Sequence, residues 1–216
     1  MTKYIFFDLD GTLTDSQKGI LRSLHHALEF YGIGRSDDEL KKYIGPPLLE
    51  TFERGFGFSR EKAADAVAKY REYYAEKGIF ESSVYDGIPE LLSELQNTGR
   101  RLAVATSKPE EFAVRICEKF QIARYFDCIC GSRMDETRSR KAEVIAYALE
   151  RCGQEGSREN VTMVGDRSND IQGAQANKIR SVGVLFGYGS RKELTDAGAD
   201  FLAETVADLR TLLLER

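Results

Sequence analysis

Short apolar runs alternate with helical patterns along the C-terminal part of the chain. From residue 85 onward, the apolar runs cover 101–106, 126–131, 161–166, 181–187 and 201–202. The segments between them carry helix signals, such as a proline near the start or a glycine after the end, and cover 87–99, 109–120, 139–153 and 169–178. Short strands that are apolar on both sides, joined by helices, predict a parallel sheet covered on both faces. The expected fold class is therefore α/β.

Residues 16–83 interrupt this alternation. They carry helical patterns without a convincing strand, in four segments at 18–32, 36–45, 48–57 and 59–78. The insertion follows the first apolar run, Tyr4–Phe7. We therefore expect an α/β core domain of residues 1–15 and 84–216, and an inserted all-helical cap domain of residues 16–83 (the cap).

Capping boxes predict the starts of two helices. Ser36 is followed three residues later by Glu39, and Thr205 is followed at the same spacing by Asp208. A hydroxyl and a carboxylate at this spacing satisfy two backbone N–H groups that an isolated helix start leaves unpaired.

Composition and charge exclude several classes of partner. Hydrophobic residues make up 42% of the 216 residues and charged residues 31%, as in ordinary soluble proteins. The formal net charge is −4 and the basic residues are scattered, which argues against nucleic acid or an anionic membrane as a partner. No apolar run approaches the ~20 residues of a membrane span, and the first run ends in acids, unlike a signal peptide. We expect a cytoplasmic monomer or homodimer.

The four cysteines are Cys117, Cys128, Cys130 and Cys152. The spacing of Cys128 and Cys130 suits neither a zinc knuckle nor a redox pair. Because both lie in an expected strand, we place their thiols on opposite sides of it. Four reduced thiols in a cytoplasmic protein are the expectation.

Two acids follow the first apolar run directly, in the stretch Asp8-Leu9-Asp10-Gly11-Thr12. Side chains two residues apart on a strand point the same way, so the carboxylates of Asp8 and Asp10 are expected to lie together. In an open parallel sheet, ligands bind beyond the carboxyl ends of the strands. The acids therefore mark a candidate site.

Further reactive groups follow other strands. Thr106-Ser107 and Gly165-Asp166 end two apolar runs, Asp170 follows a turn later, and Lys141 lies near a helix start. Carboxylates converging on one crevice would repel each other without a cation. Mg²⁺ takes oxygen ligands and leaves positions for a phosphate oxygen. The sequence thus predicts Mg²⁺ and an anionic substrate at this edge of the sheet.

The segments DLDGTLTD, VATSKP, RKAEVIAYAL and MVGDRSND resemble, in order, the four motifs of the haloacid dehalogenase superfamily, and they span essentially the whole chain. Within it, the chain resembles phosphoglycolate phosphatase-type enzymes. The resemblance implies a Rossmann-like core with a C1-type helical cap. It also implies Mg²⁺-dependent hydrolysis of a phosphomonoester, a small phosphorylated metabolite that is either phosphoglycolate-like or a nucleoside monophosphate.

The resemblance also implies roles for matching residues. Asp8 matches the nucleophile that forms an aspartyl-phosphate, and Asp10 the acid that protonates the leaving oxygen and then activates water. Thr106 matches the hydroxyl that holds the phosphoryl group, and Lys141 the cation that offsets charge. The implied Mg²⁺ ligands are Asp8, the Asp10 backbone carbonyl and Asp166, with Asp170 nearby.

Substrate contacts come from the phosphate loop and the cap. Gly11 and Thr12 offer backbone N–H groups to phosphate oxygens, and Ser107 follows the motif threonine. We expect helix 16–31 and the Tyr43–Pro47 turn to face the leaving group. Cations that could bind a second anionic group are Lys18, Arg22 and Arg54.

Three alternatives remain. Dehalogenating relatives do not keep an acid at the position of Asp10, which disfavours halide displacement. A β-phosphoglucomutase-like phosphomutase shares all four motifs. A phosphate-binding regulatory module without catalysis is the third reading, and the intact acids and Lys141 argue against it. The third motif lacks the usual proline after the lysine, which leaves Arg138 and Arg140 as possible substitutes for Lys141.

Overall fold

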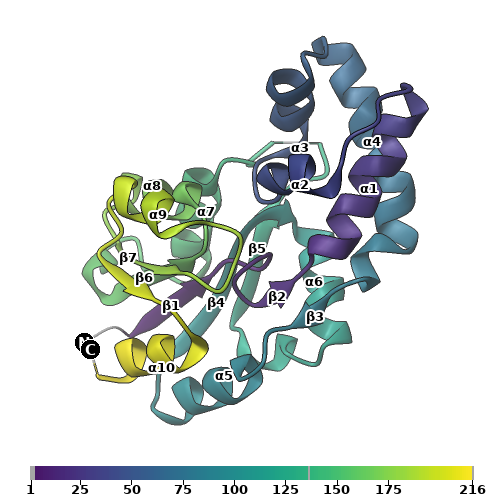
Figure 1. Ribbon diagram of the computed structural model, residues 1–216. Helices are drawn as coiled ribbons and strands as arrows, with labels where there is room; N and C mark the ends of the chain where they lie inside the picture. Colours follow the sequence, from purple (N-terminus) through teal and green to yellow (C-terminus); the bar gives the residue numbers. More distant parts are fainter. Residues whose placement is uncertain (1–2, 136, 216) are drawn as a thin grey trace.

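The computed structural model describes residues 3–135 and 137–215, and its core is one six-stranded parallel sheet (Figure 1). The spatial order is β5-β4-β1-β6-β7-β8. The strands are β1 (Tyr4–Phe7), β4 (Arg101–Pro109), β5 (Cys128–Ser132), β6 (Val161–Gly165), β7 (Arg180–Val184) and β8 (Phe201–Ala203). Counted along the chain, these six follow the 3-2-1-4-5-6 order of doubly wound folds. The expected Rossmann-like α/β core is confirmed.

The direction of chain winding reverses between β1 and β6, which makes their carboxyl ends the topological switch point. Phe7, the last residue of β1, pairs with Val104 of β4 on one side and with Val164 of β6 on the other. Phe7, Val104 and Val164 therefore lie at the same level in the three neighbouring strands. Asp8 leaves β1 at the level where β6 reaches Gly165, so their polar ends must meet.

Alternation along β1 directs its side chains into two separate hydrophobic layers. Ile5 and Phe7 pack with helices α5 (Ile88–Asn97), α6 (Glu110–Lys119) and α10 (Val206–Glu215). Tyr4 and Phe6 pack with α7 (Lys141–Arg151) and α8 (Ser168–Ala176) on the opposite face. A strand that is buried on both faces needs an uninterrupted apolar run, which explains the sequence YIFF.

The cap lies beside the core as a helical group (Figure 1). Its long helices α1 (Gln17–Phe30) and α4 (Arg60–Glu76) pack against each other. The two expected segments between them form short α-helices, α2 (Asp37–Leu40) and α3 (Leu48–Glu50). Helix α2 continues into a 3₁₀ turn, η1 (Lys41–Tyr43), and α3 continues into a π-helical turn, η2 (Thr51–Gly55). Ser36 and Glu39 form the expected capping box.

Two short antiparallel strands join the cap to the core. They are β2 (Thr14–Asp15) and β3 (Ser83–Val84), and neither was expected from the sequence. A two-residue strand carries too little hydrophobic alternation to be recognised in a sequence. The pair lies at the two proposed domain crossings, but the boundaries themselves stay a prediction.

Other elements differ from expectation in extent. Strand β4 runs three residues past the expected end at residue 106, with a register shift against β5 between Ala105 and Pro109. Helix α9 (Arg191–Asp196), which begins at the Ser190 cap, was not expected. The remaining short helical turns are η3 (Gly78–Phe80), η4 (Ala123–Tyr125) and η5 (Arg158–Asn160).

The expected orientation of two cysteines is wrong. Cys128 and Cys130 lie in β5 and belong to the same hydrophobic layer, with their sulfur atoms 3.7 Å apart. Residues i and i+2 of a strand share one face, so these thiols face the same way.

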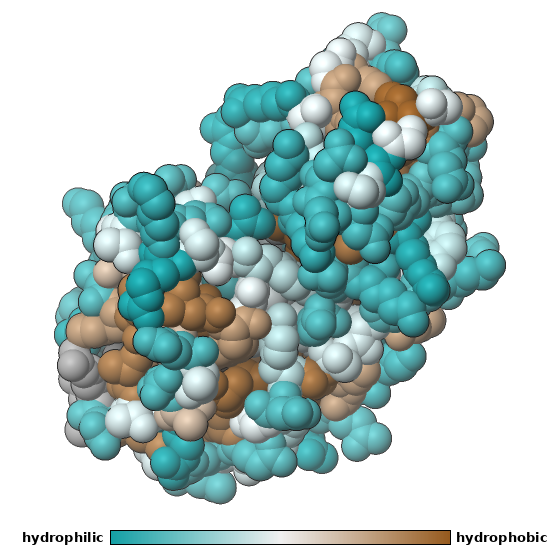
Figure 2. Space-filling model, in the orientation of Figure 1, coloured by the Kyte–Doolittle hydropathy of each residue, from teal (hydrophilic) through white to brown (hydrophobic). Residues whose placement is uncertain are grey.

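The visible surface is mostly hydrophilic over the cap, with hydrophobic residues gathered over part of the core (Figure 2). Within the described residues, no helix combines the length and apolar character that crossing a membrane requires.

Candidate active site

Asp8 lies at the switch point with its side chain directed beyond β1. Its backbone N–H continues the sheet by donating to the Val164 carbonyl, at 2.9 Å. One carboxylate oxygen, Oδ1, accepts a hydrogen bond from the Leu9 N–H at 2.8 Å and lies 2.8 Å from Lys141 Nζ. Asp8 is buried apart from 6% of its surface. A backbone donor and a cation thus fix this carboxylate at the end of the central strand.

Asp10 lies nearby, on the side that faces the cap. Its Oδ1 is 2.7 Å from Nζ of Lys108, which lies near the end of β4. The same ammonium donates to the hydroxyl of Tyr74 on cap helix α4 and lies over its ring. Burial, followed by the negative charge of Asp10, raises the pKa of Tyr74 well above its usual value, so the phenol stays neutral. One lysine therefore joins Asp10 to the cap.

Gly11 allows the chain to turn sharply between the two acids and the first cap connection. Its φ is +82°, a left-handed conformation that favours glycine. A Cβ at this position would lie 2.3 Å from Oδ2 of Asp166. The turn is closed by the Gly11 N–H, which donates to the Thr14 carbonyl at 2.8 Å.

Asp166 follows β6 and is completely buried. Its Oδ1 accepts a hydrogen bond from the Thr12 hydroxyl at 3.2 Å, and its Oδ2 accepts one from the Tyr188 N–H at 2.8 Å. Burial raises the pKa of Asp166 well above its usual value, and the charges of Asp170 and Asp8 raise it further. The positive charge of Arg167 opposes this rise, but among the residues that the structure describes Asp166 forms no ion pair. The carboxylate is thus positioned by hydrogen bonds alone.

Lys141, the first residue of α7, is the cation that faces the acids. Its Nζ lies 2.8 Å from both Asp8 Oδ1 and Asp170 Oδ1, and it donates to the Ala105 carbonyl at 3.1 Å. Burial by itself would lower the pKa of Lys141, but Asp170 and Asp8 together raise it above the ordinary value. Lys141 therefore remains charged.

The alternative cations lie elsewhere. Arg138 pairs with Glu110 at 3.2 Å and donates to the Gly131 carbonyl. Arg140 is exposed at the N-terminal boundary of α7, next to Lys141. Within the described residues, Lys141 is thus the cation of motif III that contacts Asp8.

The three buried acids fit a divalent cation. Asp8, Asp166 and Asp170 each offer an oxygen, and these atoms all lie within 4.8 Å of one another. Asp170 Oδ1 is buried and makes no hydrogen bond, although it is close to Lys141. Three carboxylates against one ammonium leave excess negative charge in a buried space, and oxygen ligands of this kind suit Mg²⁺.

Thr106 and Ser107 lie at the end of the strand next to β1. The Thr106 side chain is buried, and its Oγ1 accepts a hydrogen bond from the Lys108 N–H at 3.3 Å. Ser107 is partly exposed and lines two clefts between the cap and the core. The structure therefore gathers the residues of all four motifs at one edge of the sheet.

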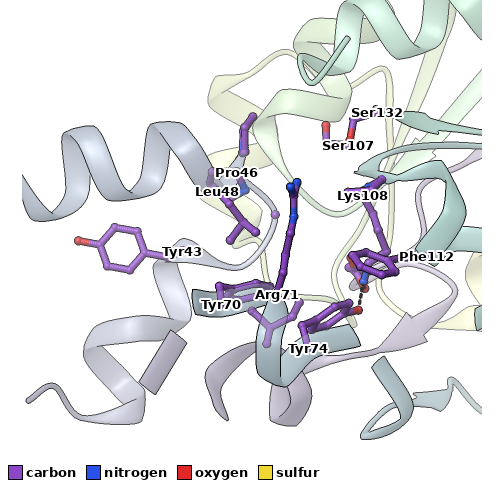
Figure 3. Close-up of a pocket in the computed structure, with 15 residues that line it drawn as sticks. Tyr43, Pro46, Leu48, Tyr70, Arg71, Tyr74, Ser107, Lys108, Phe112 and Ser132 are labelled. Carbon is purple, nitrogen blue, oxygen red and sulfur yellow. Dashed lines mark hydrogen bonds and ion pairs between the residues drawn. The ribbon is translucent and has the colours of Figure 1, made fainter. Parts of the chain in front are cut away.

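The first of these clefts extends from Asp10 toward the cap (Figure 3). Its walls are largely aromatic and aliphatic, with Lys108, Arg71 and two serines as polar groups. The apolar lining residues include Tyr43, Pro46, Leu48, Tyr70, Tyr74 and Phe112. Figure 3 shows the Arg71 side chain rising from α4 between the cap turn and Lys108, and its guanidinium donates to the Met134 carbonyl at 2.8 Å.

The three cations proposed from the sequence to bind a second anionic group do not lie together at the first cleft. Arg22 pairs with Glu81 and is half exposed, and it is not among the residues that line the clefts described here. Lys18 is exposed. Arg54 lines the second cleft, with its side chain 80% exposed and paired with Glu50 at 2.5 Å. The Tyr43–Pro47 turn contributes to the first cleft, and its contact with the leaving group stays a prediction.

Three contacts of the site were missed by sequence reasoning: Lys108, Arg71 and Tyr188. Lys108 lies inside the segment VATSKP, two residues after Thr106, so the sequence could have indicated that it lies near the site. Arg71 lies on a helix with many charges, where one cation cannot be distinguished from the others. The Tyr188 hydroxyl contacts Asp15 and the Ser16 N–H at the cap junction, a contact between distant segments.

Known proteins resemble the chain over nearly its whole length. A 5'-nucleotidase of Pseudomonas aeruginosa is 43% identical over 210 residues, which are 97% of this chain and 94% of that protein. The tyrosine-protein kinase PtkA of Mycobacterium tuberculosis is 42% identical, over 97% of this chain and 72% of its own length. The crystal structure of a predicted phosphatase from Clostridium acetobutylicum, 43% identical, covers both chains fully with a TM-score of 0.97.

The family comparison covers the sheet from β1 to β7, with β8 outside the matched range, and all four motifs. The family model described as haloacid dehalogenase-like hydrolase matches residues 5–184, from the first strand to the end of β7. This range includes every residue of the buried acid cluster. The chain therefore belongs to the haloacid dehalogenase-like hydrolase family.

Proposed function

We propose that the protein is a Mg²⁺-dependent phosphatase that hydrolyses a small phosphomonoester through an aspartyl-phosphate on Asp8. The observation that carries the proposal is the position of Asp8: a fixed, buried carboxylate at the switch point, 2.8 Å from Lys141 and beside two further buried acids. The family match and the phosphatase and nucleotidase names of similar proteins support the same reaction class.

The roles of the protein groups follow from their positions. Asp8 attacks phosphorus, which forms an O–P bond to the carboxylate and breaks the bond to the leaving oxygen. Asp10 lies on the cap side, where the leaving group must depart, and supplies its proton. The ammonium of Lys141 offsets the negative charge of the transferring phosphoryl group, and the Thr106 hydroxyl holds that group by a hydrogen bond. Asp10 then accepts a proton from the water that releases phosphate from Asp8.

Asp8, Asp166 and Asp170 would hold Mg²⁺, together with the carbonyl of Asp10. When bound, the ion neutralises negative charge on the phosphoryl group and on the acids around it. The Gly11 turn and Thr12 lie against Asp166 and keep this carboxylate in place.

The first cleft favours a leaving group with a flat, partly apolar portion. Its aromatic and aliphatic walls suit the base and sugar of a nucleoside monophosphate, as in the activity named for the Pseudomonas relative. Arg71 offers a second anion contact, which favours a phosphoglycolate-like acid as the next candidate. A phosphomutase would need the phosphorylated Asp8 to survive until a product is rephosphorylated.

The test is turnover of p-nitrophenyl phosphate by the wild-type protein with and without Mg²⁺, compared with Asp8→Asn. Metal-dependent release that is lost in the variant supports the proposal. Absence of turnover with every substrate would favour a binding module instead. A panel of nucleoside monophosphates, phosphoglycolate, pyrophosphate, phosphotyrosine and sugar phosphates, ranked by kcat/KM, then identifies the substrate class. Sugar phosphate isomerisation would favour the mutase.

A further inference from the structure

Three thiols gather at the end of the core opposite to the acids. Cys128 begins β5, and its sulfur lies 3.1 Å from that of Cys152, which follows the last residue of α7. Cys130 Sγ lies 3.7 Å from Cys128 Sγ on the other side. Lys141 is the first residue of the same 11-residue helix, so the thiols lie roughly 16 Å along the helix axis from the active-site lysine.

The three sulfurs differ in access. Cys128 and Cys130 are buried, with 8% and 0% of their surfaces exposed, whereas Cys152 is partly exposed. Cys117, the fourth cysteine, is a buried residue of α6 in the opposite hydrophobic layer. A small reagent would therefore reach Cys152 first, and the only sulfur in contact with Cys152 among the described residues is that of Cys128.

The surroundings also favour a reactive sulfur. Hydrogen bonds from Cys130 and Cys152 lower the pKa of Cys128, and the positive charges of Arg151 and Arg101 act in the same direction. The hydrogen bond to Cys128, together with burial, raises the pKa of Cys152, so the proton stays on the Cys152 sulfur and the Cys128 sulfur can accept it. Burial, by contrast, raises the pKa of Cys117 to about 12, so that thiol remains protonated and unreactive at neutral pH. The chain thus contains a reactive group of thiols and an internal reference.

We propose that Cys128 and Cys152 form a reversible intramolecular disulfide when the protein meets a hydroperoxide. This inference does not depend on the proposed phosphatase activity. The cluster is therefore a modification site at the end of the core opposite to the acids. Cys130, which lies beside Cys128 on β5, serves as a neighbouring hydrogen-bond donor to the Cys128 sulfur.

The disulfide forms in two steps. The Cys152 sulfur attacks one oxygen of hydrogen peroxide while its proton passes to the neighbouring Cys128 thiolate, so an S–O bond forms, the O–O bond breaks and the released hydroxide takes a proton from solvent to leave as water. The Cys128 sulfur then attacks the sulfenic sulfur of Cys152 and gives its proton to the departing hydroxide, so an S–S bond forms, the S–O bond breaks and a second water leaves. Both sulfurs are oxidised and the peroxide is reduced.

The bond needs little movement of the fold. The two sulfurs are already in contact, and closing a bond of about 2.05 Å requires an approach of about 1 Å. It would link the start of β5 to the end of α7 and constrain the unfolded chain between them. We expect the oxidised protein to melt roughly 5–10 °C above the reduced protein, because the linkage restricts the denatured state.

The test is a titration of the purified, fully reduced protein with hydrogen peroxide, followed by alkylation and peptide mass spectrometry without reductant. The expected product is one intramolecular disulfide between the Cys128 and Cys152 peptides, two thiols lost, and recovery of both with dithiothreitol. Cys152→Ser should abolish the disulfide, and Cys117→Ser should leave it unchanged. In Cys128→Ser, the sulfenic acid at Cys152 should persist long enough to be trapped by dimedone.

Other products would overturn the proposal. Oxygen addition to Cys152 without a disulfide in the wild-type protein would do so, as would a Cys128–Cys130 linkage, an intermolecular dimer, or reaction of Cys117 at the same peroxide concentration. Should Cys128→Ser not fold, Cys152→Ser carries the test, because residue 152 is partly exposed after the end of α7. A melting temperature identical in the two redox states would contradict the expected constraint on the unfolded chain.

Discussion

The ammonium of Lys108 lies 2.7 Å from the carboxylate of Asp10. Both side chains are almost completely buried, and the lysine also reaches the hydroxyl of Tyr74 on cap helix α4. A buried ammonium needs such partners, because loss of water is otherwise unfavourable. The orientation of Asp10 is therefore tied to the position of the cap.

Replacing Lys108 tests this link. Lys108→Met should lower kcat by about 10–100-fold, because Asp10 loses the partner that orients it for proton transfer, with a smaller change in KM. Steady-state kinetics with an aryl phosphate measures the split. Lys108→Arg should recover part of kcat, and Tyr74→Phe should lower it less than Lys108→Met. A change confined to KM would instead place Lys108 in substrate binding alone.

Substitutions of Asp8 and of Asp10 should block different steps of the reaction. Asp8→Asn should form no phosphoenzyme, because the amide is a poor nucleophile. Asp10→Asn should still form it with an activated aryl phosphate and then hydrolyse it about 100–10,000-fold more slowly, because the water is not activated. Acid quenching with a radiolabelled substrate measures the trapped fraction. Equal labelling of the two variants would contradict the assignment of roles.

Mg²⁺ should stabilise the protein more strongly at pH 7.5 than at pH 5. Burial raises the pKa of Asp170 from 3.8 to about 6, and the pKa of Asp166 is raised as well. A carboxyl whose folded pKa is raised favours the folded state below that pKa, and this contribution is lost as pH rises from about 4 to about 6. Bound Mg²⁺ restores it by pairing with the deprotonated acids.

Thermal melting with Mg²⁺ or with EDTA, at both pH values, measures this effect. Asp166→Asn should reduce the gain given by Mg²⁺ and should make the metal-free protein less sensitive to rising pH. A gain from Mg²⁺ that is equal at the two pH values, or unaffected by Asp166→Asn, would place the ion elsewhere.

Gly11 and Gly32 form a matched pair for a steric test. Both have positive φ values, +82° and +67°, but a Cβ at Gly32 would meet no atom within 4 Å, whereas one at Gly11 would overlap Asp166. Gly32→Ala should lower the free energy of unfolding by about 1 kcal/mol through backbone strain. Gly11→Ala should lower it by about 3 kcal/mol, because overpacking is added. Denaturant titration measures both values, and similar losses would contradict the contact.

The sheet was predictable because its strands are buried on both faces. The run YIFF leaves little choice of structure, and the order of the polar strand ends then indicates where Asp8 and Asp166 must meet. Local capping signals were equally informative, since Thr205 and Asp208 form the expected reciprocal hydrogen bonds. In each case a short segment contains the physical cause of its own conformation.

What the sequence could not reveal depends on contacts between distant segments. Strand β2 exists because β3, almost 70 residues later, pairs with it. Arg71 and Arg22 are alike in sequence, and only the packing of α1 and α4 directs one toward the cleft and the other toward Glu81. The cysteine error had a different origin, because the period of a strand, correctly applied, places Cys128 and Cys130 on the same side.

The pairing of Thr14 with Val84 has a consequence for how such proteins diversify. The chain leaves the core and returns to it at neighbouring points, so the span between them can lengthen, shorten or be exchanged for another fold while the strand order of the six-stranded sheet remains intact. Under the proposed function, selectivity and reactivity are thus encoded in separable stretches of the gene. Natural selection can alter the first by recombination without rebuilding the second.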